Sequence, residues 1–168
     1  MEVTFRTAAA EAALLALKDA AIPGMCIGAG TVLTVEQAEA AIAAGSEFVI
    51  SPGVNPEVVS YCVEHEVPVF PGIATPTDIQ AAMNLGVDTL KFFPAGLTQP
   101  EGLKAMKAVL PKTTPVYVVG GVEPDGLGPW LSAGAAGFGI GSSLYKPGRD
   151  VAEVGAVAKA FVQALRGV

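Results

Sequence analysis

The stretch Asp88-Thr89-Leu90-Lys91-Phe92-Phe93-Pro94-Ala95 places one lysine inside a short apolar run that ends at a proline. Its alternation predicts a strand with Lys91 and Phe93 on one face and Leu90 and Phe92 on the other. Burial of an ammonium group is costly unless the charge is paired or neutralised. Lys91 therefore either extends its charged end to water or serves as a desolvated amine that can form a Schiff base.

The composition predicts one cytoplasmic globular domain over residues 1–168. Apolar residues make up 51% of the chain, which is enough for a substantial core. The formal net charge is -6 and no basic cluster is present, so neither nucleic acid nor a membrane surface is an expected partner. No apolar run has the length of a membrane span, and the N-terminus lacks the pattern of a signal peptide.

The supply of cysteine and histidine argues against metal and cofactor chemistry. Cys26 and Cys62 form no CxxC pair and are expected to be reduced thiols. His65 is the only histidine, so a zinc site or a His-dependent triad is poorly supplied. We expect His65 to have a structural or surface role, and we expect neither a metal nor a cofactor.

The chain alternates between predicted strands and predicted helices. The strand midpoints lie about 20 to 27 residues apart, which is typical of compact β/α units. The predicted strands are Glu2–Phe5, Met25–Ala29, Glu47–Ser51, Val67–Phe70, Thr89–Phe93, Val116–Val119 and Gly137–Gly141. The predicted helices are Ala8–Ala20, Val35–Ala44, a helix opened by Asn55-Pro56, a helix opened by Thr75-Pro76 or Thr77, Gln99–Val109, a poorer helix over Glu123–Ala133, and Asp150–Leu165.

Because each strand is followed by a crossover helix, the sheet should be parallel. The short, even units and the lack of a GxGxxG fingerprint favour an α/β TIM (β/α)8-type barrel over a doubly wound open sheet. Seven strands are one fewer than eight. A missing first β/α unit explains this count, and a natural gap or a different closure are the alternatives.

Two further groups of residues could serve a reaction at Lys91. In the opening strand, Glu2 and Arg6 share a face, where Arg6 can hold a carboxylate and Glu2 can shuttle protons. The alternative is an ordinary ion pair on a solvated strand. Gly120-Gly121 and Gly141-Ser142-Ser143 follow neighbouring strands and together predict a phosphate site, although turns also use glycine freely.

Six ordered motifs together resemble a known family. The motifs are Glu2-Val3-Thr4-Phe5-Arg6-Thr7, Gly28-Ala29-Gly30-Thr31-Val32-Leu33, Ile50-Ser51-Pro52-Gly53, Pro71-Gly72-Ile73-Ala74-Thr75-Pro76, Lys91-Phe92-Phe93-Pro94-Ala95 and Val119-Gly120-Gly121-Val122. With these motifs the chain is similar to the class I 2-keto-3-deoxy-6-phosphogluconate (KDPG) aldolases and the sister 2-keto-3-deoxy-6-phosphogalactonate aldolases over essentially its whole length.

The resemblance implies a role for each candidate residue. Lys91 matches the Schiff-base lysine and Glu2 the acid/base that shuttles protons through water. The remaining matches are Arg6 and Thr31 for the keto-acid carboxylate, Pro52 and Phe93 for the pocket walls, and Gly120, Gly121, Gly141, Ser142 and Ser143 for the phosphate cradle, with either serine as the donor.

The implied activity is a lyase reaction. It reversibly cleaves a phosphorylated keto acid to pyruvate and glyceraldehyde 3-phosphate without a metal, and the family resemblance implies a homotrimer. The epimer at C4 stays open, since Val119 resembles the phosphogalactonate branch and Arg6 the phosphogluconate branch. The alternatives are an inactive truncated or engineered barrel that acts as a self-assembling scaffold, and another phosphate-binding barrel such as a thiamin-phosphate or tryptophan-pathway enzyme.

Overall fold

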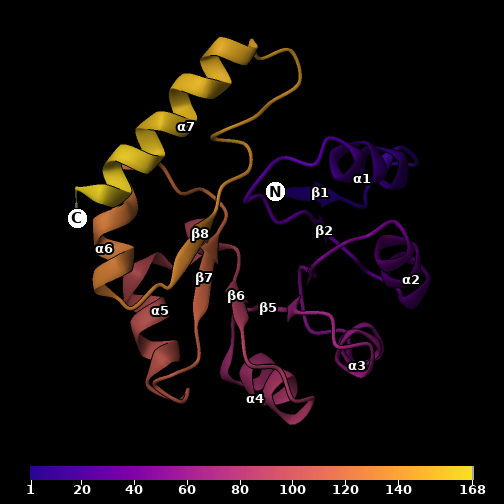
Figure 1. The fold of residues 1–168 in the computed structure, drawn as a ribbon. Coiled ribbons are helices and arrows are strands. Elements are labelled where there is room, and N and C mark those ends of the chain that lie inside the picture. The colour runs from indigo at the N-terminus through magenta and orange to yellow at the C-terminus, as the bar shows by residue number, and fades with distance from the viewer. Residues whose placement is uncertain (168) are drawn as a thin grey trace. The chain divides into compact units, whose positions relative to one another are not determined.

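The computed structural model describes residues 1–167, in which strands and helices alternate along the chain (Figure 1). The strands are β1 (Glu2–Thr4), β2 (Gly28–Gly30), β3 (Val49–Ile50), β4 (Val69–Phe70), β5 (Gly72–Ile73), β6 (Leu90–Phe92), β7 (Val116–Val119) and β8 (Gly137–Gly139). The helices are α1 (Ala10–Asp19), α2 (Val35–Ala43), α3 (Pro56–Glu64), α4 (Pro76–Asn84), α5 (Gln99–Lys107), α6 (Leu127–Ser132) and α7 (Val151–Arg166), with 3-10 turns η1 (Ala95–Leu97) and η2 (Pro124–Gly126).

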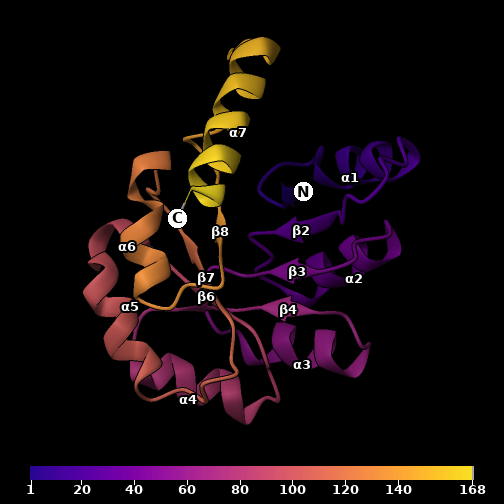
Figure 2. The ribbon, with the colours of Figure 1, turned by 60° about the vertical axis from the view of Figure 1, so that its left-hand side comes forward.

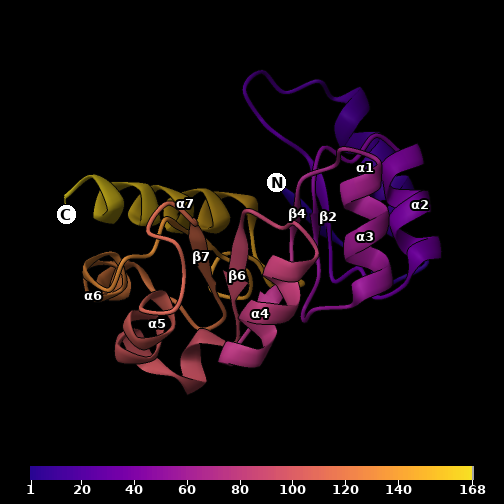
Figure 3. The same cartoon turned by 90° about the horizontal axis from the view of Figure 1, so that it is seen from below.

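The chain divides into two compact units, residues 1–90 and 91–168. In the first unit, β1, β2, β3 and β4 form a sheet in that order, and each neighbouring pair is parallel. The helices α1, α2 and α3 lie side by side along one face of this sheet (Figures 2 and 3). Parallel strands with crossover helices are the arrangement that the β/α alternation predicts.

Three helices of the first unit, α2, α3 and α4, begin at residues whose side chains cap them, whereas α1 begins after Ala9 without a side-chain cap. Thr34 accepts a hydrogen bond from the Gln37 N–H, and Asn55 accepts one from the Glu57 N–H ahead of Pro56. Thr75 forms a capping box with Asp78 at the start of α4. These side chains satisfy N–H groups that lack a partner in the first turn. The starts predicted at Thr34 and Asn55 are confirmed, and at α4 the structure decides for Thr75 over Thr77.

In the second unit, β7 and β8 are parallel neighbours, and α5, α6 and α7 lie next to one another in sequence order (Figure 1). Glycine in β8 makes room for β7. A Cβ at Gly137 would lie 2.8 Å from the Tyr117 ring, and one at Gly139 would lie 2.7 Å from a Val119 methyl group. The weak helix predicted over Glu123–Ala133 is confirmed, because this segment contains only η2 and the short α6.

Most strands are shorter than predicted by one to three residues, and the structure differs further at two places. The predicted strand Met25–Ala29 begins only at Gly28, because the Met25 N–H bonds to the Ile22 carbonyl and holds a turn there. The short strand β5 was not predicted. Pro71 separates it from β4, and since proline has no N–H it interrupts the ladder at that position.

None of the helices within residues 1–167 has both the length and the hydrophobicity needed to span a bilayer. In the same residues, both cysteines are free thiols, and no group of three or more His, Cys, Asp and Glu side chains could hold a metal ion. His65 is exposed at the end of α3 and stacks on Tyr61, with ring centroids 4.0 Å apart. The structural or surface role expected for His65 is therefore confirmed.

Candidate active site

Lys91 is a buried residue of β6. It is only 6% exposed, and its Nζ lies over the Phe93 ring, 4.5 Å from the centroid. Phe92 points the other way and packs against Trp130 of α6, with ring centroids 6.1 Å apart. The predicted division of this strand into a lysine face and an apolar face is thus confirmed. The amine is withdrawn from water rather than extended into it.

The paired glycines follow β7 in a conformation that favours glycine. Gly120 has φ +100° and Gly121 has φ +78°, both in the region that residues with a Cβ rarely adopt. The Gly120 carbonyl accepts a hydrogen bond of 3.0 Å from the Gly96 N–H, in the turn that follows β6. A Cβ at Gly120 would lie 3.3 Å from two carbons of the Phe93 ring. The loop after β7 therefore lies directly beside the Lys91–Phe93 segment.

The two serines after β8 differ in their surroundings. The Ser143 hydroxyl lies 2.9 Å from the Val122 carbonyl and 2.8 Å from a Glu123 carboxylate oxygen. A hydroxyl has one proton to donate, so this group is already engaged. Ser142 is exposed, and its hydroxyl makes no hydrogen bond to any other described residue. The structure thus separates two positions that the sequence left equivalent.

Arg149 holds the turn that contains these serines. Its guanidinium donates to the carbonyls of Ser143, at 2.6 Å, and Leu144, at 2.8 Å, and pairs with Glu153 at 3.1 Å. Gly141 accepts from the N–H groups of Leu144 and Tyr145, which closes a single helical turn. Sequence reasoning missed Arg149, because its contacts with the serine turn are to carbonyl oxygens, which leave no pattern in the residue types; the spacing of Arg149 and Glu153 predicts only the ion pair.

In the first unit, the residues of the opening segment alternate between exposed polar and partly buried apolar side chains, as predicted. Glu2, Thr4 and Arg6 are exposed, while Val3 and Phe5 are partly buried. The Glu2 carboxyl lies over Gly30 of the neighbouring strand, at a place that any Cβ on Gly30 would occupy. Gly30 is thus a second position that sequence reasoning missed, although its place inside a Gly-Ala-Gly strand is a signal of close approach by another group.

Three more candidates of the first unit follow the ends of neighbouring parallel strands, with Arg6 after β1, Thr31 after β2 and Pro52 after β3. Thr31 has φ +56°, an unusual conformation for a β-branched residue. Such conformations cost about 1–3 kcal/mol and are concentrated at functional sites. The Pro52 carbonyl lies against Gly72, where a Cβ would overlap it.

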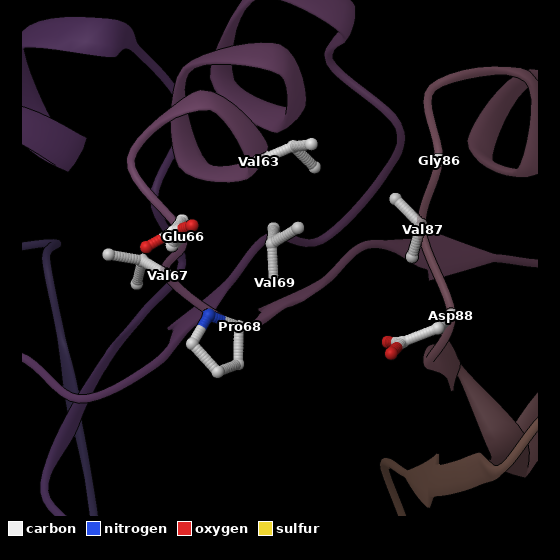
Figure 4. Close-up of a pocket in the computed structure, with 8 residues that line it drawn as sticks. All are labelled: Val63, Glu66, Val67, Pro68, Val69, Gly86, Val87 and Asp88. Atoms are coloured by element: carbon white, nitrogen blue, oxygen red, sulfur yellow. The ribbon is translucent and has the colours of Figure 1, made fainter.

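A pocket of about 250 Å³ lies in the first unit, among residues at the end of α3, at the start of β4 and just before β6 (Figure 4). Most of the candidate residues lie instead after the C-terminal ends of their strands. The pocket contains no predicted site residue. Its lining residues are Val63, Glu66, Val67, Pro68, Val69, Gly86, Val87 and Asp88. Their valines and two carboxylates supply neither a nucleophile nor an anion-binding loop.

Residues 1–157 match the family model described as KDPG and KHG aldolase. This chain belongs to the KDPG and KHG aldolase family. It is 39% identical to the 2-dehydro-3-deoxy-6-phosphogalactonate aldolase of Escherichia coli K12, over 99% of this chain and 81% of that enzyme. It is 43% identical to the 2-dehydro-3-deoxy-phosphogluconate aldolase of Treponema pallidum, over 90% of this chain and 71% of that enzyme.

Solved structures of this aldolase family have the same fold. A native KDPGal structure superposes with a TM-score of 0.95 at 39% identity, over 99% of this chain and 81% of that one. The KDPG aldolase of Legionella pneumophila, with pyruvate captured as a covalent carbinolamine, superposes with a TM-score of 0.80 at 31% identity, over 99% of this chain and 79% of that one. The predicted α/β TIM (β/α)8-type barrel fold is therefore confirmed.

The family match also confirms that the chain is an aldolase, a carbon–carbon lyase. The comparisons do not favour an inactive scaffold. They favour an aldolase over a thiamin-phosphate or tryptophan-pathway enzyme.

Proposed function

We propose that this aldolase forms a Schiff base through Lys91 and reversibly cleaves a 2-keto-3-deoxy-6-phospho sugar acid. The products are pyruvate and glyceraldehyde 3-phosphate. The observation that carries the proposal is a lysine only 6% exposed, on a strand whose neighbouring loop has two glycines at positive φ. A desolvated amine favours its neutral, nucleophilic form, and open backbone N–H groups suit a phosphate.

In the proposed reaction, the Lys91 amine attacks the C2 ketone, and water leaves to give an iminium. The iminium accepts the electron pair of the C3–C4 bond as that bond breaks. Glu2, acting through a water, takes the proton of the C4 hydroxyl and later returns a proton to the enamine carbon. Hydrolysis of the iminium then frees pyruvate and restores the amine.

The other candidates would orient the substrate. Arg6 and Thr31 would hold the keto-acid carboxylate, and Arg6 suits it because a guanidinium can bind both oxygens. Pro52 and Phe93 would form the walls beside the reacting carbons. Gly120, Gly121 and the turn of Gly141 would cradle the phosphate.

The test is reductive trapping. Incubation with pyruvate and borohydride should leave one stable adduct on Lys91, located by peptide mass spectrometry. Lys104→Arg, at an exposed position of α5, is the matched control and should be trapped like the wild type. An active enzyme that leaves Lys91 unmodified under these conditions would contradict the proposal.

Between the two serines, we propose Ser142 as the phosphate donor, because the Ser143 hydroxyl is engaged by Val122 and Glu123. Ser142→Ala should raise KM for the phosphorylated substrate with little change in thermal stability. Ser143→Ala should mainly lower stability, by about 1 kcal/mol for the lost hydrogen bonds. The reverse assignment would appear as a raised KM only in Ser143→Ala.

For the epimer, we propose the phosphogalactonate acid as the better substrate. The 99% coverage of this chain by the E. coli phosphogalactonate aldolase and the TM-score of 0.95 with the native KDPGal structure support this order, whereas the 43% identity to the T. pallidum phosphogluconate aldolase, over 90% of the chain, points the other way. Comparison of kcat/KM for the two epimers tests it directly, and a higher value for the phosphogluconate acid would reverse the assignment.

We also propose that the enzyme is a homotrimer. The chain matches a designed cage built by fusing symmetric oligomeric domains, at 39% identity over 99% of this chain and 62% of that one, which supports a symmetric oligomer. Light scattering after size exclusion should give three times the chain mass. A monomer mass would contradict the proposal.

A further inference from the structure

We propose that Phe93 is a positioning residue that couples anion binding at Gly120–Gly121 to the reactivity of the Lys91 amine. The coupling rests on the proposed function, in which Lys91 forms the Schiff base and the glycine loop holds the phosphate. The new element is a physical link between the Lys91 amine and the Gly120–Gly121 loop, through the Phe93 ring, which contacts both.

The first contact of the ring is with Lys91. The Nζ lies 4.5 Å from the Phe93 centroid, well within the distance at which an aromatic face attracts a cation. Lys91 is buried, so its long side chain has few alternative positions. Any displacement of the ring therefore changes where the amine lies and how strongly its charged form is favoured.

The second contact is with Gly120. A Cβ placed there would lie 3.3 Å from both Cδ2 and Cε2 of Phe93, a spacing tighter than most side chains accept. The ring therefore packs directly on the backbone of the loop. Gly120 also has φ +100°, so glycine is needed here both for the backbone conformation and for the close approach of the ring.

The loop and the turn that follows Phe93 are joined a second time. The Gly96 N–H donates to the Gly120 carbonyl at 3.0 Å, and the Gly96 Cα lies 3.6 Å from the position of a Cβ at Gly121. The segment from Lys91 to Gly96 therefore contacts the glycine loop at both its ring and its turn. An anion held by the N–H groups of the loop would restrain this segment too.

The consequence is a two-way coupling. If phosphate at the loop favours the ring position in which Lys91 reacts, it strengthens imine formation with pyruvate, and pyruvate must strengthen phosphate binding by the same factor. Because a single ring transmits the effect, we expect a coupling at the low end of the usual range, about five-fold.

The experiment uses the intact enzyme with pyruvate and inorganic phosphate. Borohydride trapping is measured by intact mass across a range of pyruvate concentrations. Phosphate is titrated to saturation, and chloride keeps the ionic strength constant. In the wild type, phosphate should lower the pyruvate concentration for half-maximal trapping about five-fold.

Three variants isolate the ring. Phe93→Leu removes it but stays apolar, and the half-maximal pyruvate concentration should then be independent of phosphate. Phe93→Tyr restores a ring and should restore the response. Phe92→Leu makes the same truncation one residue away, on the face that packs against Trp130. Phe92→Leu should lower Tm yet keep the phosphate dependence of trapping. If Phe93 acted only through stability, Phe92→Leu and Phe93→Leu would both lose that dependence.

A wild type that is trapped on Lys91 equally well with and without phosphate would overturn the coupling and leave the Schiff-base function standing. A full response in Phe93→Leu would also overturn it, as would loss of phosphate binding in that variant by far more than the coupling factor. Absence of trapping in the wild type would overturn the proposed function, and the coupling with it.

Discussion

The two units of the chain place their functional segments in different ways. In residues 1–90, α2, α3 and α4 each start at a residue whose side chain caps the helix, namely Thr34, Asn55 and Thr75. In residues 91–167, α5 and α6 start without a side-chain cap, and only α7 has one, from Asp150. Three of the four helices of the first unit therefore start at caps set by neighbours in sequence, whereas α1 starts after Ala9 without a side-chain cap.

The second unit depends more on contacts between residues far apart in the chain, a kind of contact that the first unit also has between Glu2 and Gly30. Phe93 packs on Gly120, Gly96 bonds to Gly120, and Ser143 bonds to Val122. Local caps are individually modest, whereas packed rings and buried groups carry larger free energies. Substitution of a packed ring of the second unit should therefore lower stability more than substitution of a helix cap of the first.

The largest effect is expected at Lys91. Lys91→Met keeps the length and burial of the side chain but removes the amine, so the covalent route is lost. We expect kcat/KM to fall on the order of 10³-fold or more. Assays of aldol cleavage, with circular dichroism to verify folding, measure this. Activity within ten-fold of wild type in a folded Lys91→Met would exclude a Schiff base at this position.

The next largest effect is expected for the other face of the same strand. Phe92 is 1% exposed and packs against Trp130. Phe92→Ala should lower the free energy of unfolding by about 3–5 kcal/mol. Leu97→Ala, at a residue 82% exposed in the turn that follows, is the control and should stay within about 0.5 kcal/mol of wild type. Denaturant unfolding of both variants measures the contrast, and equal losses would contradict it.

A smaller effect is expected for a cap of the first unit. Thr75→Ala removes the hydroxyl that accepts from the Asp78 N–H, and should cost about 1 kcal/mol of unfolding free energy. Thr77→Ala, at the exposed second residue of the same helix, should cost much less. If Thr75→Ala destabilised the enzyme as much as Phe92→Ala, the proposed difference between the two units would not hold.

The smallest effect depends on pH and concerns Asp78. Partial burial tends to raise the pKa of this carboxyl, but hydrogen bonds from the N–H groups of Ala74 and Thr75 and from the Thr75 side chain hold the pKa below its usual value. A lowered pKa in the folded state stabilises the enzyme above the ordinary value of the group, and this stability is lost as pH falls through the lowered pKa.

Asp78→Asn should therefore be less stable than wild type at neutral pH, by about 0.5 kcal/mol. The difference should shrink as pH falls below about 4. Thermal unfolding of both proteins from neutral to acid pH measures it. A difference that grows on acidification would contradict the assigned direction of the pKa shift.

The sequence by itself determined the β/α alternation, the caps at Thr34 and Asn55, and the two faces of the Lys91 strand, whereas the structure decided for Thr75 over Thr77 at α4. Each depends on residues within a few positions of one another, through periodicity or the unpaired N–H groups of a first turn. The short β5 escaped prediction because Pro71 separates it from β4 by a single residue, and a proline predicts the end of a strand rather than the start of a new one.

Only the tertiary structure decided which serine hydroxyl is engaged, why Gly30 and Gly120 must be glycine, and what the Phe93 ring touches. Ser143 meets Glu123 across 20 positions of the chain, and Gly120 meets Phe93 across a similar separation. Hydrogen bonds and close packing of this kind depend on how the chain folds back on itself. The residue types alone therefore predicted Lys91 as the reactive residue, and only the fold showed that the Phe93 ring and the Gly120–Gly121 loop lie beside it.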